Sequence, residues 1–145
     1  MQLMISNLYE YFEPQQEYYL ENISYNKLNN IPNVIEYAIN VVDNVDVNLL
    51  EEGVEVIVGR KIFFDPNGVF ELTVSFGANL HFNEEKKNEY NWDEINIENE
   101  FIKYGDFVIG NLISHISMLI ANITASFGQP PMMLPPKLVG FNIEK

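Results

Sequence analysis

The chain has 145 residues, 47% of them hydrophobic, which is enough to bury one core and too few for two ordinary domains. Lys and Arg number 8 against 21 Asp and Glu, so the net charge of -13 repels a phosphate backbone and argues against nucleic acid as a partner. The absence of cysteine excludes disulfides, thiolate nucleophiles and cysteine zinc sites.

The N-terminus, Met1 to Asn7, lacks the basic start and the continuous apolar segment of a signal peptide. Polar residues also interrupt the apolar runs before they reach the length of a membrane span. We therefore expect a cytoplasmic protein with no membrane partner. We expect residues 1–16 to be an N-terminal extension and residues 17–145 to form a single domain.

Two strands are predicted from alternation of apolar and polar residues. Between residues 70 and 82 the even positions are apolar and the odd positions mostly polar, which indicates a strand with one buried face. Between residues 37 and 49 the odd positions are mostly apolar, and Glu51-Glu52-Gly53 supplies the next turn. The polar residues Asp43, Asp46, Asn48 and Glu51 lack the spacing of a calcium loop, so we expect them to lie on a solvated strand edge.

A hairpin is predicted around Asp65-Pro66-Asn67-Gly68, which joins a strand at 54–64 to a strand at 69–83. Pro66 fits the fixed φ of a type I turn, and we expect Gly68 to take a positive φ. Residues 17–25 predict a further strand, joined to the sheet through a short loop around Pro32. The polar stretch from 83 to 100 predicts a surface excursion with a short helical piece.

A long helix is predicted from Phe107 to Phe127, with no interior proline. One broad apolar stripe is expected to lie on the sheet: Ile109, Leu112, Ile113, Ile116, Leu119, Ile120, Ile123 and Phe127. The opposite side carries a seam of mostly small residues: Phe107, Asn111, Ser114, Met118, Ala121 and Ala125. Small residues let a second helix approach closely, so we expect this seam to be an oligomer interface. The alternative is a helix half covered by its own loops.

No catalytic, metal or cofactor site is predicted. His81 and His115 have no ligand-like neighbour at local spacing, the glycines form no phosphate-binding loop, and no serine sits in a glycine elbow. What remains is apolar and aromatic surface, in which Trp92, Ile95 and Met132 stand out as candidates for binding flexible apolar partners. We therefore expect a binding protein and not an enzyme.

The segment after the helix resembles a known family. Gly128, Pro130, Pro131, Met132, Leu134 and Pro136 match the segment that follows the long helix in the SecB family of protein-export chaperones. A weaker match is Glu21-Asn22-Ile23-Ser24-Tyr25 before Pro32, which resembles the first strand of the family. The resemblance covers residues 17 to 139 and implies an α+β fold, a four-stranded antiparallel sheet followed by one long C-terminal helix packed on it.

The resemblance implies an ATP-independent cytoplasmic holdase that forms a dimer of dimers and keeps unfolded polypeptides from aggregating before export. Ile31, Tyr37 and Phe107 fall near the part of the family where the client groove forms, so with Trp92, Ile95 and Met132 they make up the predicted client-binding set.

Departures from the family leave alternatives open. The acidic positions with which the family docks on the export ATPase correspond to Asn22 and Asn26, which are uncharged, so a role in protein export and docking on that ATPase are left open. We also expect the family's second helix and tail to be nearly absent. The competing interpretations are a dedicated chaperone for one partner, such as an antitoxin, and a non-catalytic module that joins a specific complex or binds a small hydrophobic ligand.

Overall fold

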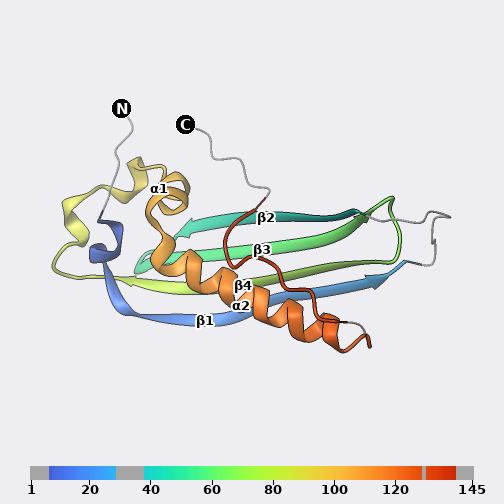
Figure 1. The fold of residues 1–145 in the computed structure, drawn as a ribbon. Helices are drawn as coiled ribbons and strands as arrows, with labels where there is room; N and C mark the ends of the chain where they lie inside the picture. Colours follow the sequence, from blue (N-terminus) through green and yellow to red (C-terminus); the bar gives the residue numbers. More distant parts are fainter. Residues whose placement is uncertain (1–6, 29–37, 129, 140–145) are drawn as a thin grey trace.

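The computed structural model describes residues 7–28, 38–128 and 130–139. Four antiparallel strands form one sheet in the order β1-β4-β3-β2, and the helices pack on one face of it (Figure 1). The strands are Phe12–Lys27 (β1), Ala38–Leu49 (β2), Gly53–Asp65 (β3) and Phe70–Phe82 (β4), and the α-helices are Ile97–Tyr104 (α1) and Asp106–Ala125 (α2). Short 3-10 helices lie at Leu8–Tyr11, Lys87–Glu89 and Trp92–Glu94. The predicted α+β fold is confirmed.

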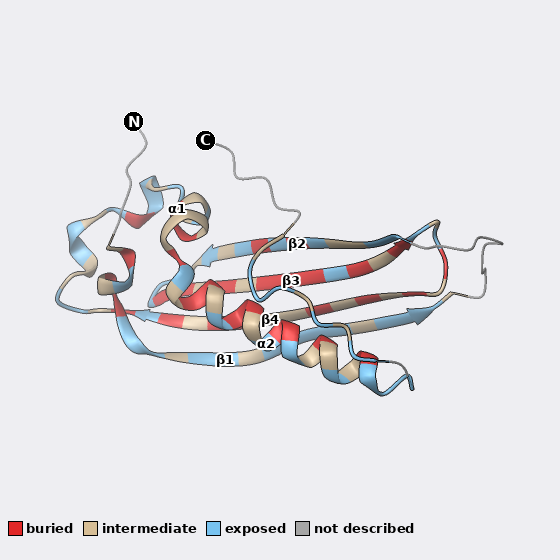
Figure 2. Cartoon of the chain, viewed as in Figure 1, coloured by how far each residue is buried: buried red, intermediate tan, exposed pale blue. Residues whose placement is uncertain are grey.

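The core lies between α2 and the two central strands, where Figure 2 shows the buried residues gathered. Twelve apolar side chains there are at most 1% exposed: Val54, Val56, Val58, Ile62, Leu72, Val74, Ala78, Leu80, Leu112, Ile113, Ile116 and Ile120. The alternation predicted for β4 and the sheet-facing stripe predicted for α2 are therefore confirmed. Phe127, at the end of that stripe, is 39% exposed and contacts the rings of Tyr25 and Phe70.

β1 begins at Phe12, five residues before the predicted start at Glu17. Residues 12–16, which were assigned to the N-terminal extension, therefore belong to the sheet, and the proposed boundary at residue 17 falls inside a strand. Phe12 is buried and stacks on Phe82 with ring centroids 5.3 Å apart. Pro14 is compatible with this position because β1 is an edge strand, which need not donate a ladder hydrogen bond at every residue.

The predicted hairpin joins β3 to β4, but its turn differs from the prediction. Among the described residues, positive φ values belong to Val69 (64°) and Gly128 (79°), so the assignment of positive φ to Gly68 is wrong. The Val69 carbonyl accepts a hydrogen bond from Leu28 N–H (3.0 Å), which ties this turn to the end of β1. Gly53 begins β3, just after the β2–β3 turn. A Cβ on this residue would lie 1.7 Å from the Leu80 carbonyl oxygen of β4, so the close approach of β3 to β4 requires glycine at this position.

α2 is apolar enough to resemble a membrane span. It has 20 residues and a mean hydropathy of 1.5, although polar residues interrupt its apolar runs. The side that faces the sheet supplies much of this apolar surface, and 44% of the apolar window is buried inside the protein. Packing on the sheet therefore accounts for a large part of the hydropathy of α2.

The chain after α2 turns back along the helix. Gly128, the residue after the predicted end of the helix at Phe127, takes the left-handed conformation that ends many helices. Residues 130–139, called the strap below, then run as an extended segment beside α2 toward β2, drawn in dark red in Figure 1. The strap covers one flank of α2 and leaves the outward side of the helix open.

Candidate functional site

An apolar groove of about 510 Å³ lies between the outward side of α2 and the strap. Six residues of α2 and four of the strap line it: Ser114, Ser117, Met118, Ala121, Asn122, Ala125, Pro131, Met133, Leu134 and Pro136. None of these side chains is charged, in a chain whose net charge is -13. An uncharged groove of this size suits apolar side chains better than ions or polar metabolites.

Helical periodicity explains why α2 presents this surface. Met118 is 67% exposed, whereas Ile116 and Ile120 on the sheet-facing side are fully buried. Ala121 leaves room beside it because its side chain ends at Cβ, and Met133 of the strap is 79% exposed. Methionine side chains are flexible and polarizable, so this surface can adapt to partners of different shape.

The predicted helix seam is only partly open. Ser114, Met118, Ala121 and Ala125 all line the groove. Asn111 is exposed and donates a hydrogen bond to the Tyr18 hydroxyl of β1 (2.8 Å). Phe107 is half-buried and packs on Phe12 and Phe101, with ring centroids 6.3 and 6.0 Å apart. The role of these six residues as an oligomer interface stays a prediction.

A buried ion pair fixes the strap against the sheet. Arg60 of β3 is fully buried and binds Asp43 of β2 through two hydrogen bonds, of 2.7 Å from Nε and 2.9 Å from Nη2. Its Nη1 donates to the Pro135 carbonyl (2.9 Å) and its Nη2 to the Lys137 carbonyl (2.7 Å). Asp43 accepts a further hydrogen bond from Val139 N–H (2.7 Å). The guanidinium and the carboxylate are thus satisfied by each other and by main-chain groups of the strap.

Two hydroxyl groups of α2 complete this contact. Thr124 Oγ accepts a hydrogen bond from Met132 N–H (2.8 Å) and donates to the Ile120 carbonyl (2.8 Å). Ser117 Oγ accepts from Arg60 Nη1 (3.0 Å) and donates to the Pro135 carbonyl (3.3 Å). The wall of the groove that the strap forms is therefore attached from both α2 and the sheet.

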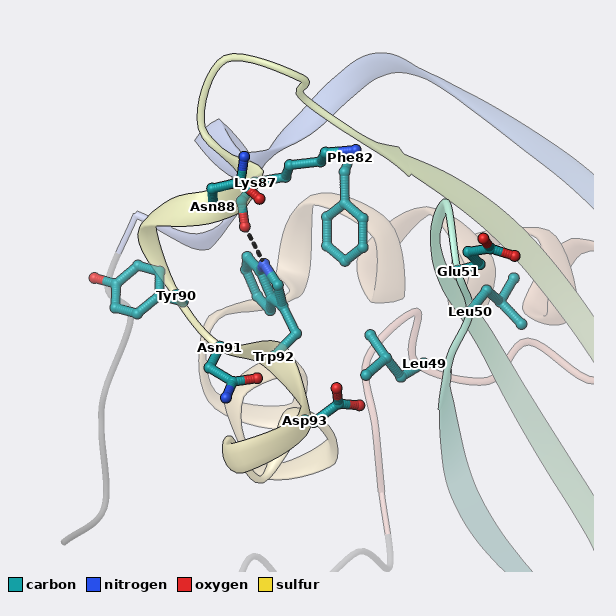
Figure 3. A pocket seen from close by; sticks show the side chains of 10 residues that line it. All are labelled: Leu49, Leu50, Glu51, Phe82, Lys87, Asn88, Tyr90, Asn91, Trp92 and Asp93. Carbon is teal, nitrogen blue, oxygen red and sulfur yellow. Dashed lines mark hydrogen bonds between the residues drawn. The ribbon is translucent and has the colours of Figure 1, made fainter.

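A second pocket, of about 540 Å³, lies beside Trp92 at the far end of the sheet (Figure 3). Trp92 is only 8% exposed, and its indole N–H donates to the Lys87 carbonyl (2.8 Å). Its ring lies among those of Tyr11, Phe12, Phe82 and Tyr90, at centroid distances of 5.0 to 5.9 Å. The lining includes Glu51, Lys87 and Asp93, so this pocket is more polar than the groove.

The tyrosine beside Trp92 is held neutral. Burial, followed by the neighbouring Tyr90 and Glu89, raises the pKa of Tyr11 above its ordinary range. Its hydroxyl accordingly stays protonated and donates to Glu89 (3.2 Å). This arrangement closes the aromatic cluster around Trp92 and gives the cluster a structural role.

The residues predicted to bind clients do not gather at one place. Ile31 and Tyr37 lie outside the described residues. Trp92, Ile95 and Phe107 pack against the core, as does Met132, whose main chain bonds to Thr124. Met132 belongs to the strap, although Met133 and not Met132 lines the groove. Client binding by these residues stays a prediction.

Sequence analysis missed the ion pair. Asp43 is 3% exposed, so the expectation of a solvated edge is wrong for this residue, although Asp46, Asn48 and Glu51 are exposed as expected. The signal was present: Asp43 and Arg60 pair directly across β2 and β3 at positions that face the core. Opposite charges at core-facing positions of neighbouring strands indicate a buried ion pair.

The histidines form no catalytic or metal constellation. His81 is exposed and lies 3.0 Å from Glu17, and the Nδ1 atom of His115 lies 2.7 Å from the Asn111 carbonyl oxygen. Within residues 7–28, 38–128 and 130–139, no three His, Asp or Glu side chains converge in a way that would hold a metal ion.

Comparison with known proteins rests on the fold. No protein-family model matches the sequence, and no curated protein matches it. Among solved structures, one similar to this chain is the Mycobacterium tuberculosis Rv1957 SecB-like chaperone in complex with a ChAD peptide from the Rv1956 HigA1 antitoxin. The TM-score is 0.60 at 13% sequence identity, and the match covers 88% of this chain and 92% of the other. The chain has a SecB-like fold. An identity this low leaves its activity to be argued from its own surface.

Proposed function

We propose that the protein is an ATP-independent chaperone that binds unfolded, apolar polypeptide segments in the groove between α2 and the strap. The observation that carries this proposal is the groove itself: it is uncharged, is open to solvent and contains two exposed methionines, Met118 and Met133. An unfolded chain offers apolar side chains and free main-chain groups whatever its sequence, so a binder of unfolded chains needs an adaptable apolar surface.

Two further observations support the proposal. The net charge of -13 keeps a protein in solution while apolar surface is exposed for a partner. The structural neighbour is in complex with a peptide from an antitoxin, which supports a polypeptide as the ligand of this fold. We therefore expect non-covalent binding with no catalysis and no cofactor, in the cytoplasm.

The second candidate function is that of a dedicated chaperone for one partner. The complex of the structural neighbour with an antitoxin peptide favours it, since a single client can use the same kind of groove. A non-catalytic module with a stoichiometric partner is the remaining alternative. Docking on the export ATPase is not proposed, because Asn22 and Asn26 are exposed on β1 but carry no charge.

We also propose a homo-oligomer, either a dimer or a dimer of dimers. The outward side of α2 is open, and an apolar row on edge strand β1 is 40 to 50% exposed: Tyr18, Leu20, Ile23 and Tyr25. Covering such surface is the usual reason for self-association. If α2 pairs through Met118 and Ala121, oligomer contact and client binding use the same residues and compete.

The test is suppression of aggregation for several unrelated proteins as they unfold, at equimolar chaperone and without nucleotide. The general chaperone is supported if most of these clients stay in solution. Protection of none of them, together with tight binding of one antitoxin, would instead establish the dedicated function. Light scattering on the same samples, with and without client, measures the molecular mass and so the number of subunits.

A further inference from the structure

The hydrogen bonds that hold the strap are made with its main chain. Arg60 donates to the carbonyls of Pro135 and Lys137, Asp43 accepts from the N–H of Val139, and Thr124 accepts from the N–H of Met132. None of these hydrogen bonds depends on the side chain that the strap residue carries. A different polypeptide segment can therefore make the same bonds.

The contacts fall on alternate residues of the strap, 135, 137 and 139, and the chain bends at Pro136 and Lys137 between them. The prolines at 130, 131, 135 and 136 fix φ at four positions, which lowers the entropy lost when the strap docks. Arg60 and Asp43 thus bind two carbonyls and one N–H that a single short segment presents to them.

The side chains of the strap anchor it weakly. Within the strap, Met132, Leu134 and Leu138 pack against the core and are only half-buried. By contrast, Met133 and Lys137 are exposed. The residues beneath are far more enclosed, since Arg60, Asp43 and Thr124 are at most 3% exposed. A buried site is therefore covered by a segment that it holds mainly through main-chain hydrogen bonds.

The site would persist without the strap. Arg60 and Asp43 hold each other through two hydrogen bonds, of 2.7 and 2.9 Å, in which the strap takes no part, and we expect these bonds to remain when the strap leaves. Water then reaches the charges, and hydration offsets the main-chain bonds that are lost. Release of the strap also removes one wall of the adjoining groove, so the two surfaces become continuous.

We propose that Arg60, Asp43 and Thr124 form a main-chain-binding site for an extended apolar segment of a partner polypeptide, and that the strap is its removable internal occupant. This inference rests on the proposed function and assigns it a mode of binding. The partner segment displaces the strap, takes over its hydrogen bonds and lays its side chains into the widened groove.

The probe for this proposal is a fluorescent synthetic peptide with the sequence of residues 130–139. A second peptide has the same side chains but carries N-methyl groups on the amides that correspond to Met132 and Val139, which removes the two donors. We expect the methylated peptide to bind at least about tenfold more weakly, the loss expected when buried acceptors are left unpaired. Equal binding of both peptides overturns main-chain recognition.

Displacement is tested by loosening the strap. Leu138 packs against the core, whereas its neighbour Lys137 is exposed, so Leu138→Asn and Lys137→Asn form a matched pair. We expect Leu138→Asn to tighten binding of the probe by about tenfold, because the tethered strap competes less well. Lys137→Asn should leave the affinity unchanged. Equal affinities for the two variants contradict displacement.

Locking the strap gives the opposite change. Met132 N lies 2.8 Å from Thr124 Oγ, so residues 124 and 132 are the neighbouring pair that we would replace by cysteines, in a chain that has no other cysteine. We expect the oxidised Thr124→Cys/Met132→Cys protein to bind the probe more weakly than the same protein after reduction, a comparison in which the loss of the Thr124 hydroxyl is common to both states, while the single-cysteine variants do not respond to the oxidant. Unchanged binding by the oxidised protein overturns the proposal. If the protein still suppresses aggregation when oxidation does not change probe binding, the proposed chaperone function is retained and only the displacement of the strap is rejected.

Discussion

Removing the buried guanidinium should destabilise the protein severely, and Arg60→Met is the variant of choice because methionine keeps much of the linear side chain. The variant loses both hydrogen bonds to Asp43 and the bonds to Ser117, Pro135 and Lys137. Asp43 is only 3% exposed and then keeps the Val139 N–H as a donor but has no cationic partner.

The expected loss of stability in Arg60→Met follows from leaving a buried acidic side chain without its partner. Removing one partner of a buried pair costs about 3 to 5 kcal/mol, against a typical total of about 5 to 15 kcal/mol for a domain. The adjacent Lys61→Met is the matched control, because Lys61 is on the other face of β3 and its side chain is 49% exposed beside Glu71 at 3.4 Å. An exposed pair of this kind is worth at most about 1 kcal/mol.

Urea unfolding followed by circular dichroism measures both variants, and a double-mutant cycle adds the decisive comparison. Asp43→Leu combined with Arg60→Met removes both charges together, so its cost should be smaller than the sum of the two single costs by about 1 to 3 kcal/mol. The argument that the pair is buried and mutually dependent is refuted if Arg60→Met lowers the free energy of unfolding by less than about 1 kcal/mol. It is also refuted if the losses in the two single variants add up to the loss in the double variant.

Three further outcomes follow from the structure. Ile116→Arg should unfold the protein because Ile116 is fully buried on the sheet. Ala121→Arg should stay folded and, if α2 pairs through the seam that contains Ala121, should show a lower mass by light scattering. A folded Ala121→Arg protein of unchanged mass would show that this seam is not an interface. Burial and the hydrogen bond to Glu55 raise the pKa of Tyr19, so the folded protein keeps the Tyr19 proton to higher pH than the unfolded chain does. The free energy of unfolding should therefore fall as pH rises above about 10. Glu55→Gln should move the ultraviolet titration of Tyr19 to lower pH, and an unchanged titration would contradict this cause of the raised pKa. Trp92 is 8% exposed and does not line the α2 groove, so saturating client should leave its emission unchanged, while a shift would place the client at the Trp92 pocket.

Much of the fold could be predicted from the sequence because β4 and α2 each bury one face. The period of two in β4 and the broad apolar stripe of α2 both follow from that one-sided burial. Gly128 likewise marks the end of the helix, since its positive φ suits glycine. The first residues of β1 could not be found this way, because an edge strand with Pro14 and neighbouring glutamines carries no apolar alternation.

The site was harder to predict because its parts come from three distant segments. Arg60, Asp43 and the strap meet only when β2, β3 and residues 135–139 are brought together. Trp92 is a different case, since it stood out as a lone tryptophan in a polar stretch and the structure buries it in an aromatic cluster, while its role in client binding stays a prediction. Local composition cannot tell whether an aromatic residue folds back onto the core.

Direct binding of an unfolded client to a groove variant tests the central claim. Met118→Glu places a charge in the apolar groove, and Val42→Glu places the same charge on the opposite face of the sheet, where Val42 is 45% exposed. The client is a labelled protein kept unfolded by reduction and alkylation of its cysteines. We predict that Met118→Glu weakens binding at least about tenfold, equal to about 1.4 kcal/mol, while Val42→Glu binds like the native protein. Equal affinities of the two folded variants would contradict binding in the α2 groove.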